Sequence, residues 1–171
     1  MDIVRRYCRS VTAVNRTVMT GASALVFVMV PAMCFGVASR YFFGVPVVWS
    51  VELPTLLLGP YFMLAGPYVL HMGGHVNVDI LSVHLPRRAA ALLDCLTIPL
   101  IIVFALVMLD QSWPLAMNAW RLGETSYSAW NPPIWWTKFF LPVGLTLMAA
   151  QALVEFLRAL MRALGRKDPL S

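Results

Sequence analysis

The stretch GPYFMLAGPYVLHMGGHVNVDI, residues 59–80, decides the fold, because it begins as an apolar segment and ends as a polar one. Its first twelve residues carry no charge and repeat Gly-Pro-Tyr at an interval of seven. Its end holds His71, His75 and Asp79. Two interpretations compete: these three side chains form a metal or haem site, or the stretch is the place where a membrane span leaves the bilayer.

The composition of the whole chain favours a membrane protein. Of its 171 residues, 60% are hydrophobic and 12% are charged, whereas soluble domains carry roughly a quarter charged residues. The net charge of +5 comes from arginines clustered at the ends of apolar segments. Such clusters are typical of membrane topology signals, so we do not expect nucleic-acid binding.

The sequence predicts an all-α integral membrane fold, formed by a single membrane domain over residues 1–171. A helix needs about 20 apolar residues to cross the hydrocarbon layer, and four segments meet that length: residues 17–39, 49–70, 89–113 and 135–156. Each segment contains proline. Membrane helices tolerate proline because neighbouring groups satisfy the freed carbonyl, and we expect kinks, particularly in the second span.

Basic residues and tryptophans predict the orientation of these spans. Ten of the thirteen basic residues fall on the side of the two termini, and Arg40, Arg121 and Lys138 fall on the other side. The positive-inside rule therefore places both termini in the cytoplasm. All six tryptophans fall on the opposite side, where indoles anchor at headgroup depth: Trp49, Trp113, Trp120, Trp130, Trp135 and Trp136.

Short interfacial helices are expected beside the spans. Ser112-Trp113-Pro114 and Gly123 frame one candidate, lying on the membrane surface between the third and fourth spans. The helical period also continues past residue 156 with Arg158 and Arg162 on one stripe. We interpret that tail as an interfacial continuation of the last helix, with its arginines at lipid headgroups, rather than as a helix for docking a partner.

The histidine-rich end of the opening stretch fits a corner better than a ligand site. His71, His75 and Asp79 have helical spacing, and two histidines with one carboxylate are a known metal set. However, Gly73-Gly74 favours a helix end near His71, and a bundle haem needs an axial ligand that the other three spans lack. We therefore predict no metal and no cofactor, with the segment after Gly74 lying along the membrane surface and Asp79 capping or tethering it.

Charged residues at the span edges offer two further hypotheses. Arg40 and Glu52 bracket one short loop, where they form an ion pair or are solvated separately. Asp94 is the deepest carboxylate, and it is either a structural group or part of an ion path. The sequence contains no nucleophile–base pairing or phosphate-binding glycine loop, so we predict no catalytic residue and no enzyme activity.

Gly59 and Gly66 lie two helical turns apart on nearly one face of the second span. Small residues on one stripe permit a partner helix to approach closely. The alternative is a kinked helix without a partner. We favour the packing interpretation.

Together these residues resemble the small membrane subunit of tripartite ATP-independent periplasmic (TRAP) transporters, the DctQ-like family. The similarity covers about residues 40–156, and each short motif gains weight from its order and spacing. Val51 and His71-Met72 depart from the family pattern, which puts an electrostatic role of those positions in doubt. The matching residues are Arg40-Tyr41-Phe42, Trp49 to Leu53, Gly66, Gly74 to Asp79, Leu85-Pro86, Gly123 to Ser126, Pro133 and Pro142-Val143-Gly144.

The resemblance implies a non-catalytic scaffold subunit in the bacterial inner membrane. It implies two protein partners, a large TRAP membrane subunit and a periplasmic substrate-binding protein, with membrane lipids around them. It also implies sodium-driven import of a small organic acid. The structural or interface candidates are Arg40, Trp49, Glu52, Gly59, Gly66, His75, Asp79, Gly123, Ser126, Pro142 and Gly144.

Two alternative functions remain open from the residues alone. A self-sufficient small transporter or exporter requires a carboxylate deep in the bundle, for which Asp94 is the candidate. A haem- or quinone-binding membrane anchor of a redox enzyme requires a ligand set inside the bundle.

Overall fold

The computed structural model describes residues 2–72 and 87–164. Within that part of the chain every regular element is a helix, and the one β-type contact is an isolated bridge between Thr125 and Pro133. The helices are α1 (Asp2–Ala24), α2 (Val26–Phe43), α3 (Trp49–His71), α5 (Arg87–Arg121) and α6 (Trp135–Ala163).

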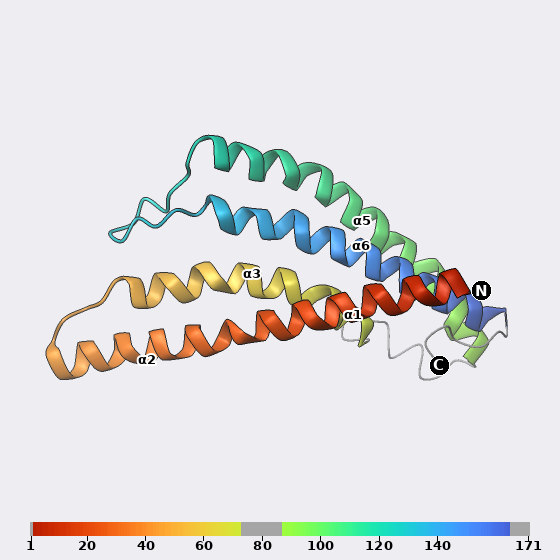
Figure 1. Cartoon of the computed structure of the whole chain (residues 1–171), viewed down its shortest axis with the longest axis horizontal. Coiled ribbons are helices and arrows are strands. Elements are labelled where there is room, and N and C mark those ends of the chain that lie inside the picture. Colours follow the sequence, from red (N-terminus) through yellow and green to blue (C-terminus); the bar gives the residue numbers. More distant parts are fainter. Residues whose placement is uncertain (1, 73–86, 165–171) are drawn as a thin grey trace.

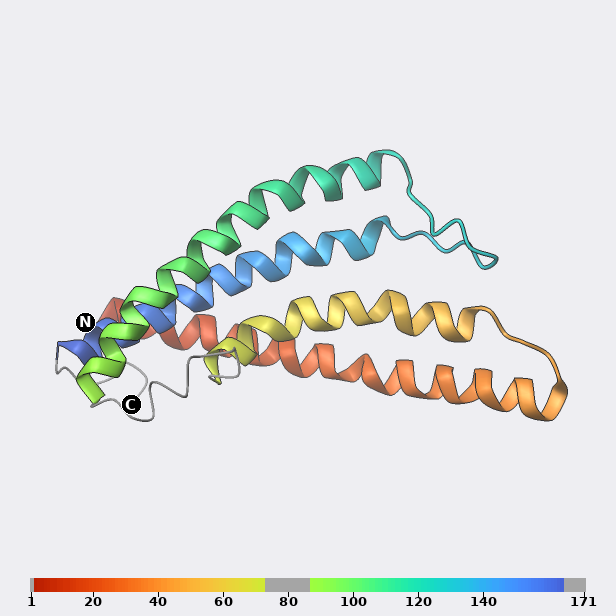
Figure 2. The same ribbon diagram turned by 180° about the vertical axis from the view of Figure 1, so that it is seen from behind.

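The spans lie side by side in the order α2, α3, α6, α5 (Figure 1). Helix α1 continues the line of α2 and packs against both α3 and α6 (Figure 2). The start of α1 and the end of α6 lie at one end of the molecule, which we call the terminal end (Figure 1). The other end, formed by residues 44–48 and 122–134, is called the loop end.

The prediction of an all-α membrane protein with four spans is confirmed. Four helical segments are long and apolar enough to cross a membrane: Ile3–Phe43, Trp49–His71, Asp94–Arg121 and Trp135–Arg162. The second matches its predicted bounds almost residue for residue, and it runs as one helix through Pro54, Pro60 and Pro67. It ends at His71, as expected from the glycine pair that follows. The predicted surface segment with His75 and Asp79 lies outside the described residues.

The predicted first span, residues 17–39, lies within a longer helical segment. The helix begins at Asp2 and continues to Phe43, with one turn at Leu25 between α1 and α2. Four of its buried residues fall at intervals of seven, which is close to two helical turns: Cys8, Asn15, Ala22 and Met29. The N-terminal arginines therefore belong to an amphipathic helix rather than to a tail.

The prediction of a separate surface helix between residues 112 and 123 is wrong, because α5 continues through Pro99 and Pro114 to Arg121. A proline removes one backbone donor, and a membrane helix tolerates that loss. Gly123 does stop the helix, with φ of +57° in the left-handed region that glycine adopts freely. Helix α6 extends to Ala163, which confirms that the tail continues the last helix.

Candidate functional site

A polar network joins three helices at the terminal end. Its members are Asn15 on α1, His71 on α3, and Gln151, Glu155 and Arg158 on α6. His71 Nδ1 lies 2.7 Å from Glu155 Oε1, and Arg158 Nη1 lies 2.8 Å from Glu155 Oε2. Gln151 Nε2 donates to Glu155 Oε1 at 3.0 Å, so a single carboxylate accepts from three side chains.

Asn15, Gln151 and Glu155 of this network are buried, whereas His71 and Arg158 are partly exposed, so the buried part is suited to holding the helices together. Asn15 Nδ2 donates to Gln151 Oε1 at 2.8 Å, and the exposed fractions of these two residues are 1% and 0%. Interhelical hydrogen bonds of this kind hold membrane helices together and fix their register. Asn15 Oδ1 is buried without a hydrogen-bond partner in the described part of the chain. The network thus ties α1, α3 and α6 at one height.

These contacts account for His71 without a metal. The imidazole is held between its own helix and the carboxylate of α6. Among residues 2–72 and 87–164, no group of three or more His, Cys, Asp or Glu side chains is placed to hold a metal ion. The two remaining members of the predicted histidine–aspartate set lie outside that part of the chain.

Asp94 also has a partner on α6. Its carboxylate lies 3.6 Å from Arg162 Nη2, and both side chains are more than a third exposed. Exposed ion pairs contribute only about 0–1 kcal/mol. The position at the end of α5 and the exposure favour a structural role over an ion path.

At the loop end, residues 124–134 form a small hairpin between α5 and α6. The backbone N–H of Ser126 donates to Pro132 O at 3.0 Å, and Ile134 N–H donates to Glu124 O at 2.9 Å. Tyr127 and Asn131 both have positive φ values, and the Asn131 side chain accepts from Tyr127 N–H at 3.0 Å. The hairpin is therefore an ordered element in the described structure.

Two polar contacts attach this hairpin to the spans. Glu52, in the first turn of α3, accepts a hydrogen bond of 2.5 Å from Ser128 Oγ. Glu124 and Lys138, at the start of α6, form an ion pair of 2.6 Å. The ion pair considered for Arg40 and Glu52 is absent from the described residues, and Glu52 is not simply solvated either, since Ser128 donates to it. Glu52 instead holds the hairpin against α3.

Close backbone packing occurs at glycines other than the predicted pair. A Cβ on Gly144 of α6 would lie 2.5 Å from Met63 O of α3, and one on Gly36 of α2 would collide with Ser50 Oγ of α3. By contrast, a Cβ on Gly59 or Gly66 would meet nothing within 4 Å. No residue in the described part of the chain therefore covers the predicted glycine stripe, and sequence reasoning missed Gly36.

A proline in α3 explains the close contact at Gly144. Met63 O would normally accept from the N–H four residues ahead, but that residue is Pro67, which has no N–H. The hydrogen of Gly144 that points along the Cβ direction therefore faces a carbonyl without its helical donor. Cα–H···O contacts of this type recur between helices. Pro142, two residues earlier on α6, is fully buried.

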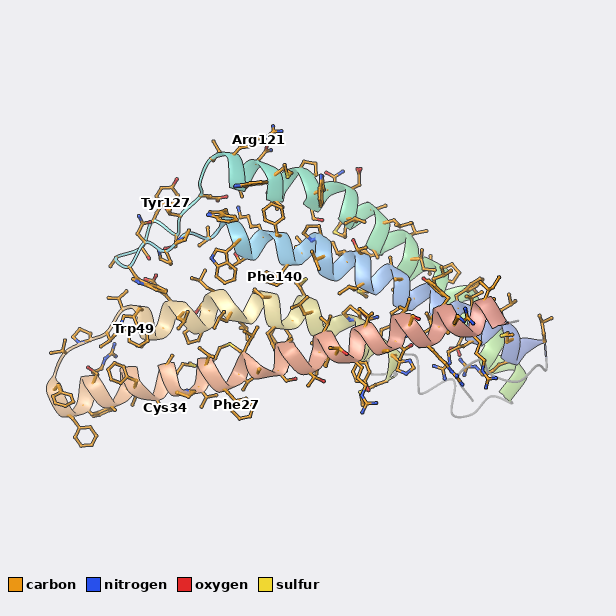
Figure 3. The ribbon with its side chains drawn as sticks, in the orientation of Figure 1. Phe27, Cys34, Trp49, Arg121, Tyr127 and Phe140 are labelled. Atoms are coloured by element: carbon orange, nitrogen blue, oxygen red, sulfur yellow. The ribbon has the colours of Figure 1, made fainter. Side chains whose placement is uncertain are left out.

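Aromatic side chains gather at the loop end. Trp49 stacks on Phe35 with ring centroids 5.6 Å apart, and Trp120 stacks on Trp135 at 6.4 Å. Figure 3 shows Trp49 and Tyr127 at this end of the molecule, opposite both termini. This is the one-sided distribution that the sequence predicts.

The fold is helical, with four helical segments long and apolar enough to cross a membrane, and the ion pairs among the described residues lie toward the two ends of these segments. Residues 11–162 match the family model described as "Tripartite ATP-independent periplasmic transporters, DctQ component". The chain therefore belongs to the DctQ family, whose members are components of TRAP transporters and not enzymes. A comparison with curated proteins gave no match.

Proposed function

We propose that this chain is the static scaffold subunit of a sodium-driven TRAP transporter in the bacterial inner membrane. It pairs with the large membrane subunit and helps a periplasmic binding protein to deliver a small organic acid. Its termini face the cytoplasm, because ten of thirteen basic residues belong in sequence to the two chain ends or to the connection between the second and third spans. The loop end then faces the periplasm, where the ordered hairpin is available to the binding protein.

The placement of ionisable groups carries this proposal. Residues 17–39, 53–70, 95–109 and 139–154 contain no Asp, Glu, His, Lys or Arg, and all four stretches lie within the described spans. Ion and proton paths through membranes depend on such groups inside the bundle. A chain without them in mid-span is suited to supporting a transport subunit, and this disfavours a self-sufficient transporter.

We propose that the large subunit binds over the uncovered glycines of α3. Gly66 lines an apolar groove of about 300 Å³ between α3, α5 and α6, together with Phe62, Phe104 and Met148. Gly59, two turns away, is exposed on α3. Because small residues permit helices to approach closely in lipid, this face of α3 fits a helix of the large subunit.

Co-purification tests the pairing. The full chain is co-expressed with a tagged large TRAP subunit from the same organism, and recovery is compared for Gly59→Leu, Gly66→Leu and wild type. We expect at least a fivefold lower yield of the pair for both variants, because a leucine occupies the space of the incoming helix. The corresponding loss, about 1 kcal/mol, is the size of one helix–helix packing or hydrogen-bond contact in a membrane.

Gly21→Leu is the matched control, since a Cβ at Gly21 also meets nothing within 4 Å but the residue lies on α1. Equal recovery for all four proteins would reject the α3 interface. If wild type itself runs alone after co-expression, the scaffold function is rejected. Reconstituted uptake of a carboxylate that persists without this chain would reject it as well.

A further inference from the structure

A second groove lies at the loop end, between the last turns of α2 and the first turn of α3. Its volume is about 350 Å³. Apolar side chains line its lower part, including Met33, Val37 and Val51, and Arg40 and Tyr41 lie nearer the loop. We call the apolar part formed by Met33, Val37 and Val51 the floor of the groove. The groove therefore combines this apolar floor with one cationic side chain, Arg40, nearer the loop.

The neighbouring polar groups are already engaged with the chain itself. Ser50, which lines the groove, donates its hydroxyl hydrogen to Val47 O at 2.6 Å, and Ser39 donates to Val45 O at 2.9 Å. Glu52, the nearest carboxylate in sequence, accepts from Ser128. Arg40 is exposed, and within the described residues none of the ion pairs involves it. Its guanidinium is thus available to an external anion.

The groove begins at headgroup depth and extends toward the hydrocarbon. Trp49 begins α3 and stacks on Phe35 of α2, and indoles favour the membrane interface. Met33 precedes Arg40 by seven residues, which places it about 10 Å further along the helix axis. Half of the hydrocarbon layer is about 15 Å thick. Trp49 marks the interface at the height of Phe35, and Met33 lies only two residues deeper, so the apolar floor enters the outermost part of that half-layer by about 3 Å.

We propose that this groove is a binding site for a glycerophospholipid of the leaflet at the loop end. The phosphate accepts hydrogen bonds from the Arg40 guanidinium, and one acyl chain lies along Val37 and Met33. Charge complementarity selects the headgroup, because arginine binds phosphate in a bidentate manner. The apolar floor selects an amphiphile rather than a free anion, since a small hydrated ion leaves that surface uncovered.

Gly36 gives the groove its shape. Because a side chain there would collide with Ser50, the helices meet at this glycine. Val37 and Arg40 flank that contact on α2, and Val51 flanks it on α3. The bound lipid thus bridges two spans beside their tightest contact.

Native mass spectrometry of the full chain tests the site. The protein is purified in detergent, titrated with phosphatidylethanolamine and phosphatidylglycerol, and scored for retained lipid. Arg40→Gln is expected to lower lipid retention about fivefold, the factor that matches the attraction of one basic residue for headgroups. Val37→Trp, which fills the floor and keeps the charge, is expected to lower it as well. Arg40→Lys should retain part of the binding.

Arg121→Gln is the control, because Arg121 is an exposed arginine at the loop end outside the groove. Its lipid retention should equal that of wild type. Unchanged retention in Arg40→Gln overturns the proposal. Displacement of the lipid by inorganic phosphate alone overturns it too, because the acyl chain then contributes nothing. The same holds if Arg40→Gln abolishes pairing with the large subunit while lipid retention stays at the wild-type level.

Discussion

Replacing Gly144 by alanine tests the packing of α6 against α3 directly. The added Cβ would lie 2.5 Å from Met63 O and 3.0 Å from both the carbonyl carbon and Cβ of Met63. Two of these three atoms belong to the backbone, so no rotation of a side chain relieves the contact. The two helices have to move apart at this height.

The cost follows from the size of that movement. Ordinary contact begins at 3.4 Å, so the Cβ and the oxygen must separate by 0.9 Å, the difference between 3.4 and 2.5 Å. Adding a methyl group to a packed interior costs about 1–3 kcal/mol. Alanine also gains up to about 1 kcal/mol over glycine from helix propensity. Gly21→Ala receives this gain without the collision, since nothing lies within 4 Å of its Cβ.

The difference between the two variants isolates the steric cost. In a protein of this size 1 kcal/mol corresponds to about 2–4 °C in Tm. We therefore expect the detergent-solubilised Gly144→Ala protein to melt about 2–12 °C below Gly21→Ala, measured by the loss of the monodisperse peak after heating. Equal melting temperatures would show that α6 does not press on the α3 backbone, and the packing argument would be wrong.

Two further predictions concern the polar contacts at either end of the spans. A double-mutant cycle on Asn15→Ala and Gln151→Ala should give a coupling free energy of about 0.6 kcal/mol, the mean for buried hydrogen bonds between membrane helices; additive losses of stability would argue against this bond. Glu52→Ala should speed amide hydrogen exchange in residues 124–134, because Ser128 loses its acceptor on α3. Exchange rates equal to those of wild type would show that the hairpin does not depend on α3.

The spans themselves could be predicted from the sequence because hydropathy alone determines them. A run of about 20 apolar residues has few alternatives to a membrane helix. The first and last residues of these helices were less predictable, because a helix continues beyond the hydrocarbon layer wherever other parts of the protein pack against it. Helix α5 extends beyond residue 113 and α6 beyond residue 156 for this reason, and their ends contain charges that a hydropathy criterion excludes.

The sequence of the N-terminal helix contains a repeat that a search based on hydropathy does not detect. Cys8, Asn15, Ala22 and Met29 recur every seven residues and are all buried, although one is polar and two are small. A search for apolar runs stops at Arg16, whereas a search for one buried face finds the stripe. The stripe then leads to Gly36, seven residues further, where α2 meets Ser50.

The predicted glycine contacts show the limit of reasoning from one helix. Gly59 and Gly66 share a face, but which glycine meets a backbone depends on how the helices are placed against each other. Gly144 does so because α6 passes the carbonyl that Pro67 leaves without a donor. The signal is the proline four residues after Met63, and it becomes informative only when the neighbouring helix is known.

Helix α6 is fixed at three heights, and this has a mechanical consequence. Near its start Lys138 pairs with Glu124, in its middle Gly144 rests on the α3 backbone, and toward its end Glu155 binds His71. Sliding α6 past α3 by one turn would separate Glu155 from His71 and force a larger residue onto Met63 O. Because the first change loses a hydrogen bond and the second overpacks the interface, we expect α6 and α3 to move as one body. That is the property required of a scaffold against which a separate transport subunit moves.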